Sequence, residues 1–279
     1  MGLGMNKLSK LPLLLYSVAR SPSEFRDRVE TALEVRWDRM RKASPSYQPV
    51  SPVEALDVLE GTLATQIRSF FQETNLTKIE AQVSDSQRTL KTKAPFPLKH
   101  NADVALARFC YALSRALAPA VILETGVAYG VTSAYLLQAI EVNGIGKLWS
   151  VDLPPLGRDA EAYVGFLVPK SLKPHWNLRR GATRRLLPEL LPLVGYIDIF
   201  VQDSLHTYRA ITDEIRMVWP FLRPGGIVIA DDIGKNRAFA DFADRVNHSG
   251  CFVIQEVDKD SMFGILVKDK QPHFQHRPA

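Results

Sequence analysis

The sequence predicts a doubly wound α/β fold preceded by helices, and three observations support this prediction. From residue 102 onward, apolar runs of strand length alternate with helical patterns. A turn of Arg223-Pro224-Gly225-Gly226 then leads into a fifth strand, and two more strand-like runs follow near the end of the chain. Strands that alternate with helices are typical of a parallel sheet covered by helices on both faces.

The expected elements follow one another in a regular order. We expect strands at residues 120–124, 147–152, 176–179, 196–203 and 227–231, and helices at residues 103–117, 132–141, 183–191 and 208–221. Residues 251–257 and 262–268 are strand-like runs joined by Asp258-Lys259-Asp260-Ser261, which predicts a hairpin. One strand must therefore run antiparallel in an otherwise parallel, Rossmann-like sheet.

Two helices are predicted before the sheet. Ser21-Pro22-Ser23-Glu24 and Ser51-Pro52-Val53-Glu54 both have the pattern of a capping box with proline at the first helical position. Each helix has one apolar face, formed by Phe25, Val29, Leu33, Trp37 and Met40 in the first and by Leu56, Leu59, Leu63, Ile67 and Phe70 in the second. We expect both faces to pack, either against the core or against a second copy in a homo-oligomer.

The segment between these helices and the sheet suggests where the chain divides. Residues 74–100 lose the helical periodicity and end in Ala94-Pro95-Phe96-Pro97, so we interpret them as a connection. The predicted organisation is a helical region at residues 1–95, an α/β domain at residues 96–270 and a disordered tail at residues 271–279.

Composition excludes several classes of protein. The formal net charge is +5, from 35 Lys and Arg against 30 Asp and Glu, but the basic residues are dispersed, so we expect no nucleic-acid partner. Only Cys110 and Cys251 are present, without the spacing of a disulfide framework or a zinc site, which favours the cytoplasm. The apolar run from Leu11 to Ala19 is too short to span a membrane and lacks a good cleavage pattern, which leaves peripheral membrane contact open.

A loop rich in glycine follows the first strand. It contains Glu124, Gly126, Ala128 and Gly130, and it resembles the acidic-x-Gly-x-Gly-x-Gly loop of class I methyltransferases, with Ala128 in place of the middle glycine. The resemblance implies that these four residues bind S-adenosyl-L-methionine. Glycine lets the backbone approach a ligand closely, and an acid suits a cofactor that bears an ammonium and a sulfonium. A dinucleotide fingerprint spaces its glycines differently.

The second strand ends in Asp152, where a Rossmann-like sheet places an acid that accepts hydrogen bonds from ribose hydroxyls. The alternative is a surface aspartate that caps the turn before Pro154-Pro155. Together with the loop above, Asp152 favours the cofactor site. In the family, the segment after the third strand contacts adenine, and here it is Gly181-Ala182-Thr183.

Three carboxylates end the fourth and fifth strands. Asp203 closes one and Asp231-Asp232 closes the next, so the fold should bring them to one edge of the sheet, above which the cofactor's sulfonium should lie. Such carboxylates repel one another unless a cation intervenes, and Mg²⁺ or Mn²⁺ prefers carboxylate oxygen. In the alternative, Asp203 caps the next helix and Asp231-Asp232 lies in a solvated loop. We assign Asp203 to both the metal site and the cofactor site.

The segment from Asp203 to Tyr208 is similar to the Asp-x-x-His-x-Tyr element of the metal-dependent macrolide-sugar O-methyltransferases, and Asp231-Asp232 matches their other metal ligands. This resemblance covers about residues 97–268. It implies that Asp203, Asp231 and Asp232 bind the metal and that His206 is the general base. If His206 were structural, it would bond a neighbouring carbonyl group in its loop. The hydroxyl acceptor would then be a sugar or another small molecule with adjacent oxygens, including a glycoside or glycolipid.

Two alternatives remain at this point. The first is a nicotinamide-dependent oxidoreductase on the same general sheet, which conflicts with the glycine spacing and with the terminal hairpin. The second is a cofactor-binding protein without catalysis, which conflicts with the presence of His206 and of the acids at residues 203, 231 and 232. We therefore favour the methyltransferase.

Overall fold

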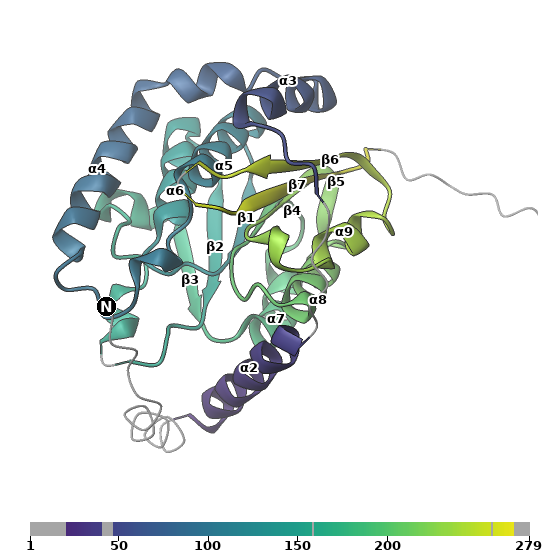
Figure 1. Ribbon diagram of the computed structural model, residues 1–279. Helices are drawn as coiled ribbons and strands as arrows, with labels where there is room; N and C mark the ends of the chain where they lie inside the picture. The colour runs from purple at the N-terminus through teal and green to yellow at the C-terminus, as the bar shows by residue number, and fades with distance from the viewer. Residues whose placement is uncertain (1–20, 41–46, 158, 258, 271–279) are drawn as a thin grey trace, which may run out of the picture.

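A seven-stranded sheet forms the centre of the computed structural model (Figure 1), which describes residues 21–40, 47–157, 159–257 and 259–270. The strand order is β3-β2-β1-β4-β5-β7-β6, and β7 is antiparallel to both of its neighbours, which confirms the predicted hairpin. The strands are β1 (Val121–Thr125), β2 (Lys147–Asp152), β3 (Trp176–Arg180), β4 (Ile197–Gln202), β5 (Leu222–Ala230), β6 (His248–Gln255) and β7 (Met262–Lys268). The predicted tail at residues 271–279 lies outside the described residues.

Helices cover both faces of the sheet (Figure 1). Helices α5 (Val104–Leu117) and α6 (Val131–Asn143) share an apolar cluster with one face, and helices α7 (Thr183–Val194), α8 (Tyr208–Val218) and α9 (Ala238–Ala243) share another with the opposite face. Successive side chains of a strand point to opposite faces. In β4, Ile199 and Val201 therefore join the first cluster while Phe200 joins the second. This is the predicted doubly wound architecture, and α9 is an addition to it.

Helix α3 (Pro52–Leu63) begins and packs as its sequence predicts. Ser51 and Glu54 form the complete capping box, and Leu56, Leu59 and Leu63 are buried in the same apolar cluster as α5 and α6. The chain just before α3 is tied to the far edge of the sheet, because the Val50 N–H donates to the Val253 carbonyl at 2.9 Å.

The predicted connection at residues 74–100 is wrong over most of its length. Residues Thr74–Leu90 form helix α4, which buries Leu76, Ile79, Val83 and Leu90 in the cluster of α5 and α6. These apolar residues are sparse and lie among polar ones, so the stripe is a narrow seam that is easily missed in the sequence. The boundary predicted after residue 95 stays a prediction, although α3 and α4 share their apolar cluster with the helices that cover the sheet.

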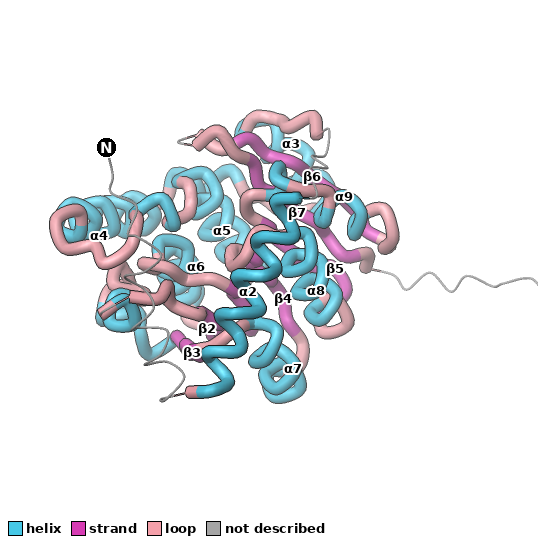
Figure 2. Tube along the Cα trace, turned by 60° about the horizontal axis from the view of Figure 1, so that its bottom comes forward, coloured by secondary structure: helices cyan, strands magenta, loops and turns pink. Residues whose placement is uncertain are grey.

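Helix α2 (Pro22–Met40) lies across the carboxyl ends of the parallel strands (Figure 2). Most of its apolar face does not pack against the other described residues, so packing against the core is not found, and packing against a second copy stays a prediction. Val29, Leu33, Trp37 and Met40 are exposed, whereas Glu24 and Asp27 are buried. None of the helices in the described part of the chain combines the length and the apolar character that a membrane span needs.

If α4 belongs to the same cooperative unit as the sheet, a cavity in its buried seam should destabilise the whole fold. Ile79→Ala should lower the free energy of unfolding by about 2–5 kcal/mol, the usual cost of this truncation in a core. Lys78→Ala, at the neighbouring exposed position, is the matched control. Denaturant unfolding followed by circular dichroism measures both. A separate early transition in the Ile79 variant, with an unchanged main transition, would contradict this expectation.

Candidate functional site

A cavity of about 520 Å³ lies at the carboxyl ends of the strands, next to the point where β1 and β4 lie side by side and the strand order reverses. Open α/β sheets bind their ligands at such a switch point. The cavity collects most of the residues that the sequence singles out, namely Gly126, Ala128, Asp152, Asp203, His206, Asp231 and Asp232, together with Gly181, Ala182 and Thr183. Glu124 and Gly130 are not among the residues that line it.

The loop after β1 depends on glycine because chain segments meet there. Gly126 has a φ of +84°, and a Cβ at this position would overlap the carbonyl group of Asp203. At Gly130, with a φ of +89°, a Cβ would lie 2.8 Å from the Cα of Gly165. Ala128 adopts the left-handed conformation with a φ of +48°, which explains why glycine is usual at this position.

Asp152 is held in place on one side and unpartnered on the other. Its Oδ1 accepts hydrogen bonds from the backbone N–H groups of Val127 at 2.9 Å and Ala128 at 3.5 Å. Its Oδ2 is buried without a hydrogen-bond partner in the described residues, and burial raises the pKa of this carboxyl. An unpartnered acceptor that lines a cavity is suited to bind a hydroxyl donor of a ligand.

Glu124 is buried rather than exposed in the cavity. Its Oε2 accepts hydrogen bonds from the hydroxyls of Ser133 and Ser150, each at 2.7 Å, and the Trp176 indole donates to Ser150 at 2.8 Å. Burial raises the pKa of Glu124 to about 7. The side chain therefore links α6, β2 and β3 below the loop that the sequence assigns to the cofactor.

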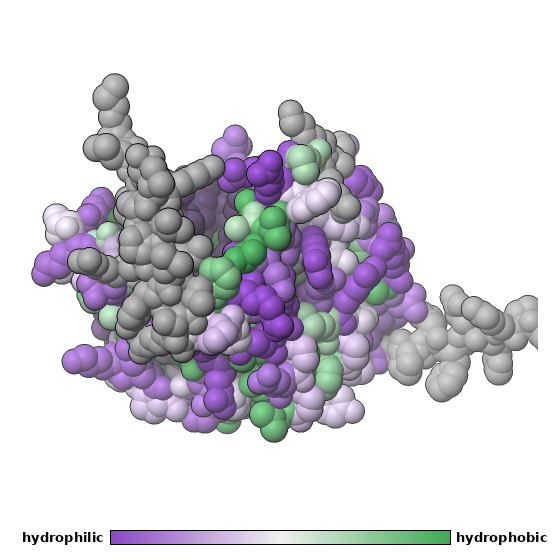
Figure 3. Space-filling model, turned by 90° about the horizontal axis from the view of Figure 1, so that it is seen from below, coloured by the Kyte–Doolittle hydropathy of each residue, from purple (hydrophilic) through white to green (hydrophobic). Residues whose placement is uncertain are grey.

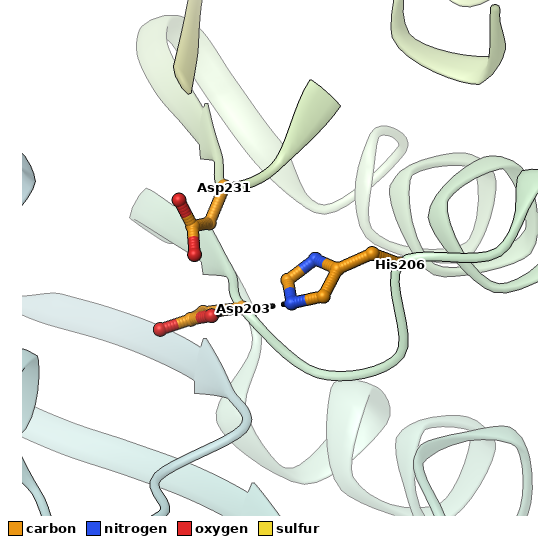
Figure 4. A group of neighbouring side chains, drawn as sticks. All are labelled: Asp203, His206 and Asp231. Atoms are coloured by element: carbon orange, nitrogen blue, oxygen red, sulfur yellow. Dashed lines mark ion pairs between the residues drawn. The ribbon is translucent and has the colours of Figure 1, made fainter. Parts of the chain in front are cut away.

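Three side chains converge at the ends of β4 and β5 (Figure 4). One ligand atom from each of Asp203, His206 and Asp231 lies within 4.8 Å of the others. The His206 Nε2 lies 3.7 Å from the Asp203 Oδ1. Burial and the neighbouring Asp231 raise the pKa of Asp203, while burial lowers the pKa of His206 and favours its neutral form.

Asp232 is arranged differently from Asp231. Its backbone is left-handed, with a φ of +53°, and its two carboxylate oxygens accept from the Ser261 hydroxyl and from the Lys235 ammonium. Its Oδ2 also lies 3.6 Å from the His206 Nε2. The structure thus brings Asp203, His206 and Asp231 together as one group, with Asp232 beside the same imidazole nitrogen as Asp203.

Two buried acids near the site have no signal in the sequence. Glu214 on α8 accepts from the hydroxyls of Thr125, Thr183 and Ser204 at 2.5–2.7 Å, and so joins the end of β1, the start of α7 and the loop after β4. Glu256, just after β6, is 5% exposed, contacts the carboxyl group of Asp231, and has its pKa raised to about 9 by burial and by that contact. Both positions depend on tertiary folding, since each acid meets residues distant in sequence.

Comparison with known proteins finds a match over the part of the chain that forms β1 to β5. Residues 123–233 match a family described as a methyltransferase domain. No curated protein is similar enough in sequence to count as a match.

Several solved structures share the fold. An O-methyltransferase from Bacillus cereus in complex with SAH has a TM-score of 0.54 at 15% identity, covering 67% of this chain and 91% of its own. TomG from Streptomyces achromogenes, an O-methyltransferase involved in tomaymycin synthesis and in complex with SAM, has a TM-score of 0.53 at 16% identity, covering 77% and 96%. The SAH-bound methyltransferase PaMTH1 from Podospora anserina has a TM-score of 0.52 at 14% identity, covering 81% and 100%.

The antiparallel β7 within an otherwise parallel series is the strand arrangement of the class I methyltransferase fold. Together with the match at residues 123–233, this arrangement shows that the chain contains a methyltransferase domain. The nicotinamide-dependent alternative is not supported.

Glu124 should make the stability of the protein depend on pH. Because its pKa is raised to about 7 in the folded state, its ionisation opposes folding, and stability should fall as the pH rises from 5 to 8. Glu124→Gln should remove up to ~3 kcal/mol of this fall, from a shift of roughly 2.5 pKa units. Denaturant unfolding across this pH range measures the effect, with the exposed Glu189→Gln as control. Parallel pH profiles for wild type and Glu124→Gln would contradict it.

Proposed function

We propose that this protein is an O-methyltransferase that acts on a hydroxyl of a sugar or of a similar small molecule with adjacent oxygens, including a glycoside or glycolipid. The observation that carries the proposal is the group formed by Asp203, His206 and Asp231, which lies in the same cavity as the loop after β1. A base beside the donor site can take the proton of an acceptor hydroxyl, and the paired carboxylates could hold a cation that lowers the pKa of that hydroxyl.

The donor is proposed to lie between the loop of residues 126–130 and the end of β2. S-adenosylmethionine supplies a methyl group on a positively charged sulfur. The unpartnered Oδ2 of Asp152 would accept from the ribose hydroxyls, while Gly181, Ala182 and Thr183 line the adjoining wall. Glu124 would act indirectly, by fixing α6 and β2 under the loop through its bonds to Ser133 and Ser150.

The acids at the ends of β4 and β5 fit a divalent cation. Asp203 and Asp231 are close together, and Asp231 is 2% exposed with its Oδ1 buried and unpartnered in the described residues. Such carboxylates repel each other without a cation, and their oxygens are the ligands that Mg²⁺ and Mn²⁺ prefer. We propose Asp203, Asp231 and Asp232 as ligands. The bonds of Asp232 to Lys235 and Ser261 would have to give way for it to take part.

His206 is proposed as the general base. A bound divalent cation lowers the pKa of a hydroxyl that it holds. The neutral imidazole, which burial favours, can take the hydroxyl proton as the oxygen forms its bond to the methyl carbon and the carbon–sulfur bond breaks. Asp232, at 3.6 Å from the Nε2, would stabilise the imidazolium that results.

The remaining features of the proposal rest on resemblance and composition. TomG and the Bacillus cereus protein are O-methyltransferases by description, which supports a hydroxyl acceptor. The preference for a sugar rests on the similarity of residues 203–208 to the macrolide-sugar enzymes. The two cysteines are free in the structure, as a protein of the cytoplasm would keep them.

Removing the Asp152 carboxylate tests the donor site. Asp152→Ala should weaken S-adenosylmethionine binding by about 1–3 kcal/mol, because it deletes an acceptor to a bound partner. Calorimetry measures the affinity. Asp159→Ala, a change in the loop after β2 at a residue outside the cavity lining, is the control. An unchanged affinity in a folded Asp152 variant would show that Asp152 does not bind the donor.

Removing the cation and the base tests the chemistry. Exhaustive chelation should abolish turnover and leave donor binding largely intact, and Mg²⁺ or Mn²⁺ should restore activity. His206→Ala should lower kcat by about 10²–10⁴-fold with little change in donor affinity. Mn²⁺ binding to Asp231→Asn, Asp232→Asn and His206→Ala should fall in the two aspartate variants only. If the His206 variant also loses Mn²⁺ binding, His206 is a metal ligand and not only a base. If full activity remains after chelation, the carboxylates are structural.

A further inference from the structure

Helix α2 lies with its acidic face toward the protein and its apolar face outward. Glu24 pairs with Arg180 at 2.6 Å, Asp27 with Arg185 at 3.1 Å, and Glu30 with Arg184 at 3.0 Å. Further along the helix, Glu34 accepts from the Thr207 hydroxyl and Asp38 from the Tyr208 N–H at 2.8 Å. These contacts decide the rotation of the helix, since they fix one face at five successive points.

The outward face combines apolar and basic side chains. Leu33, Trp37 and Met40 are 52–63% exposed and Val29 is 36% exposed, so they form a stripe along the helix. Arg26, Arg36 and Arg39 are also exposed on this side. The view from below in Figure 3 shows apolar side chains bordered by hydrophilic ones on the face of the molecule where α2 lies. The acid nearest this face, Glu30, is already engaged by Arg184.

We infer that α2 is an interfacial helix that docks the protein onto an anionic phospholipid surface. A helix with Trp and Leu on one side and arginines beside them is the kind that lies in the plane of a membrane interface. The apolar stripe would enter the boundary of the acyl chains. The three arginines would contact lipid phosphates, which are the complementary charge.

The same charges disfavour a second copy of the chain as the occupant. Two α2 helices placed face to face would bring six arginines together and offer only Glu30 from each copy as a counter-charge. The stripe is also one helix wide, whereas a stable dimer interface buries about 800 Å² on each partner. A lipid surface meets neither objection.

Docking through α2 would have a consequence for the active site. Thr31 and Glu34, on the inner side of the helix, line the cavity, so the cavity would adjoin the lipid surface. If the proposed O-methyltransferase function holds, an acceptor hydroxyl carried on a lipid headgroup could reach the site without leaving the membrane. The docking itself does not depend on that function.

Vesicle flotation with the full chain tests the inference, without methyl donor or metal. We expect binding to vesicles of phosphatidylcholine and phosphatidylglycerol that exceeds binding to pure phosphatidylcholine by at least about tenfold, from ~1 kcal/mol for each arginine. The double variant Leu33→Ser/Trp37→Ser should bind at least about tenfold more weakly, because it removes most of the apolar stripe. Arg36→Gln/Arg39→Gln should reduce the preference for anionic vesicles and its dependence on salt.

A matched control is Leu193→Ser. Leu193 is 77% exposed at the end of α7, at the opposite edge of the sheet, and its loss should leave vesicle binding unchanged. Light scattering on the same variants measures the mass in solution. The inference is overturned if the full chain binds no vesicles, if the α2 variants bind as wild type, or if the Leu33/Trp37 variant instead dissociates a dimer. Binding lost in the α2 variants and kept in Leu193→Ser supports it, whether or not any methyl transfer is found.

Discussion

The close approach of two backbone segments at the ends of β1 and β4 is the constraint on which the site depends. A side chain at Gly126 would overlap the carbonyl group of Asp203, so only glycine allows the two strand ends to meet. The Asp203 N–H donates to the Thr125 carbonyl at 2.8 Å and fixes this approach. One contact therefore places the loop that would hold the donor beside the first of the acids that would serve the chemistry. A displacement of about one ångström between this loop and Asp203 would misalign the bound donor with the groups that serve the reaction.

Charge distribution then divides the carboxyl ends of the strands into two regions. Over β2 and β3, the acids of α2 are neutralised by arginines of the sheet and of α7, as with Glu24 and Arg180. Over β4 and β5, Asp231 is buried and Asp203 is half-buried, neither forms a salt bridge with an arginine among the described residues, and Glu256 adds a third carboxyl group. The first region holds a helix in place and turns its apolar side outward. In the second, burial and the closeness of the carboxyl groups raise the pKa of Asp203 and Glu256, and this arrangement suits the cation proposed above.

Much of this architecture follows from local sequence. Alternating apolar runs predict the strands because burial on both faces requires near-continuous apolar residues, and β2 and β7 begin and end where the sequence predicts. The capping box at Ser51 and Glu54 likewise acts through neighbouring residues only. The sequence also predicts that the acids at the ends of β2, β4 and β5 lie close together, because the carboxyl ends of parallel strands meet at one edge of the sheet. Asp152, Asp203 and Asp231 do line one cavity.

The features that sequence reasoning missed depend on contacts between distant segments. The seam of α4 gains its burial from α5 and α6, and Glu256 reaches Asp231 only because the hairpin folds back beside β5. Glu124, which the sequence predicts for the donor site, does not line the cavity and accepts hydrogen bonds from Ser133 and Ser150, so its role toward the donor stays a prediction. The apolar pattern of α2 correctly predicted a helix, whereas its five acidic contacts with the rest of the chain decided which face is outside. By itself, then, the sequence determined the elements and the edge where the acids meet, because these depend on neighbouring residues. Only the tertiary structure decided which face of a helix lies outward and which residues a buried acid contacts, because both depend on side chains that are far apart in the sequence.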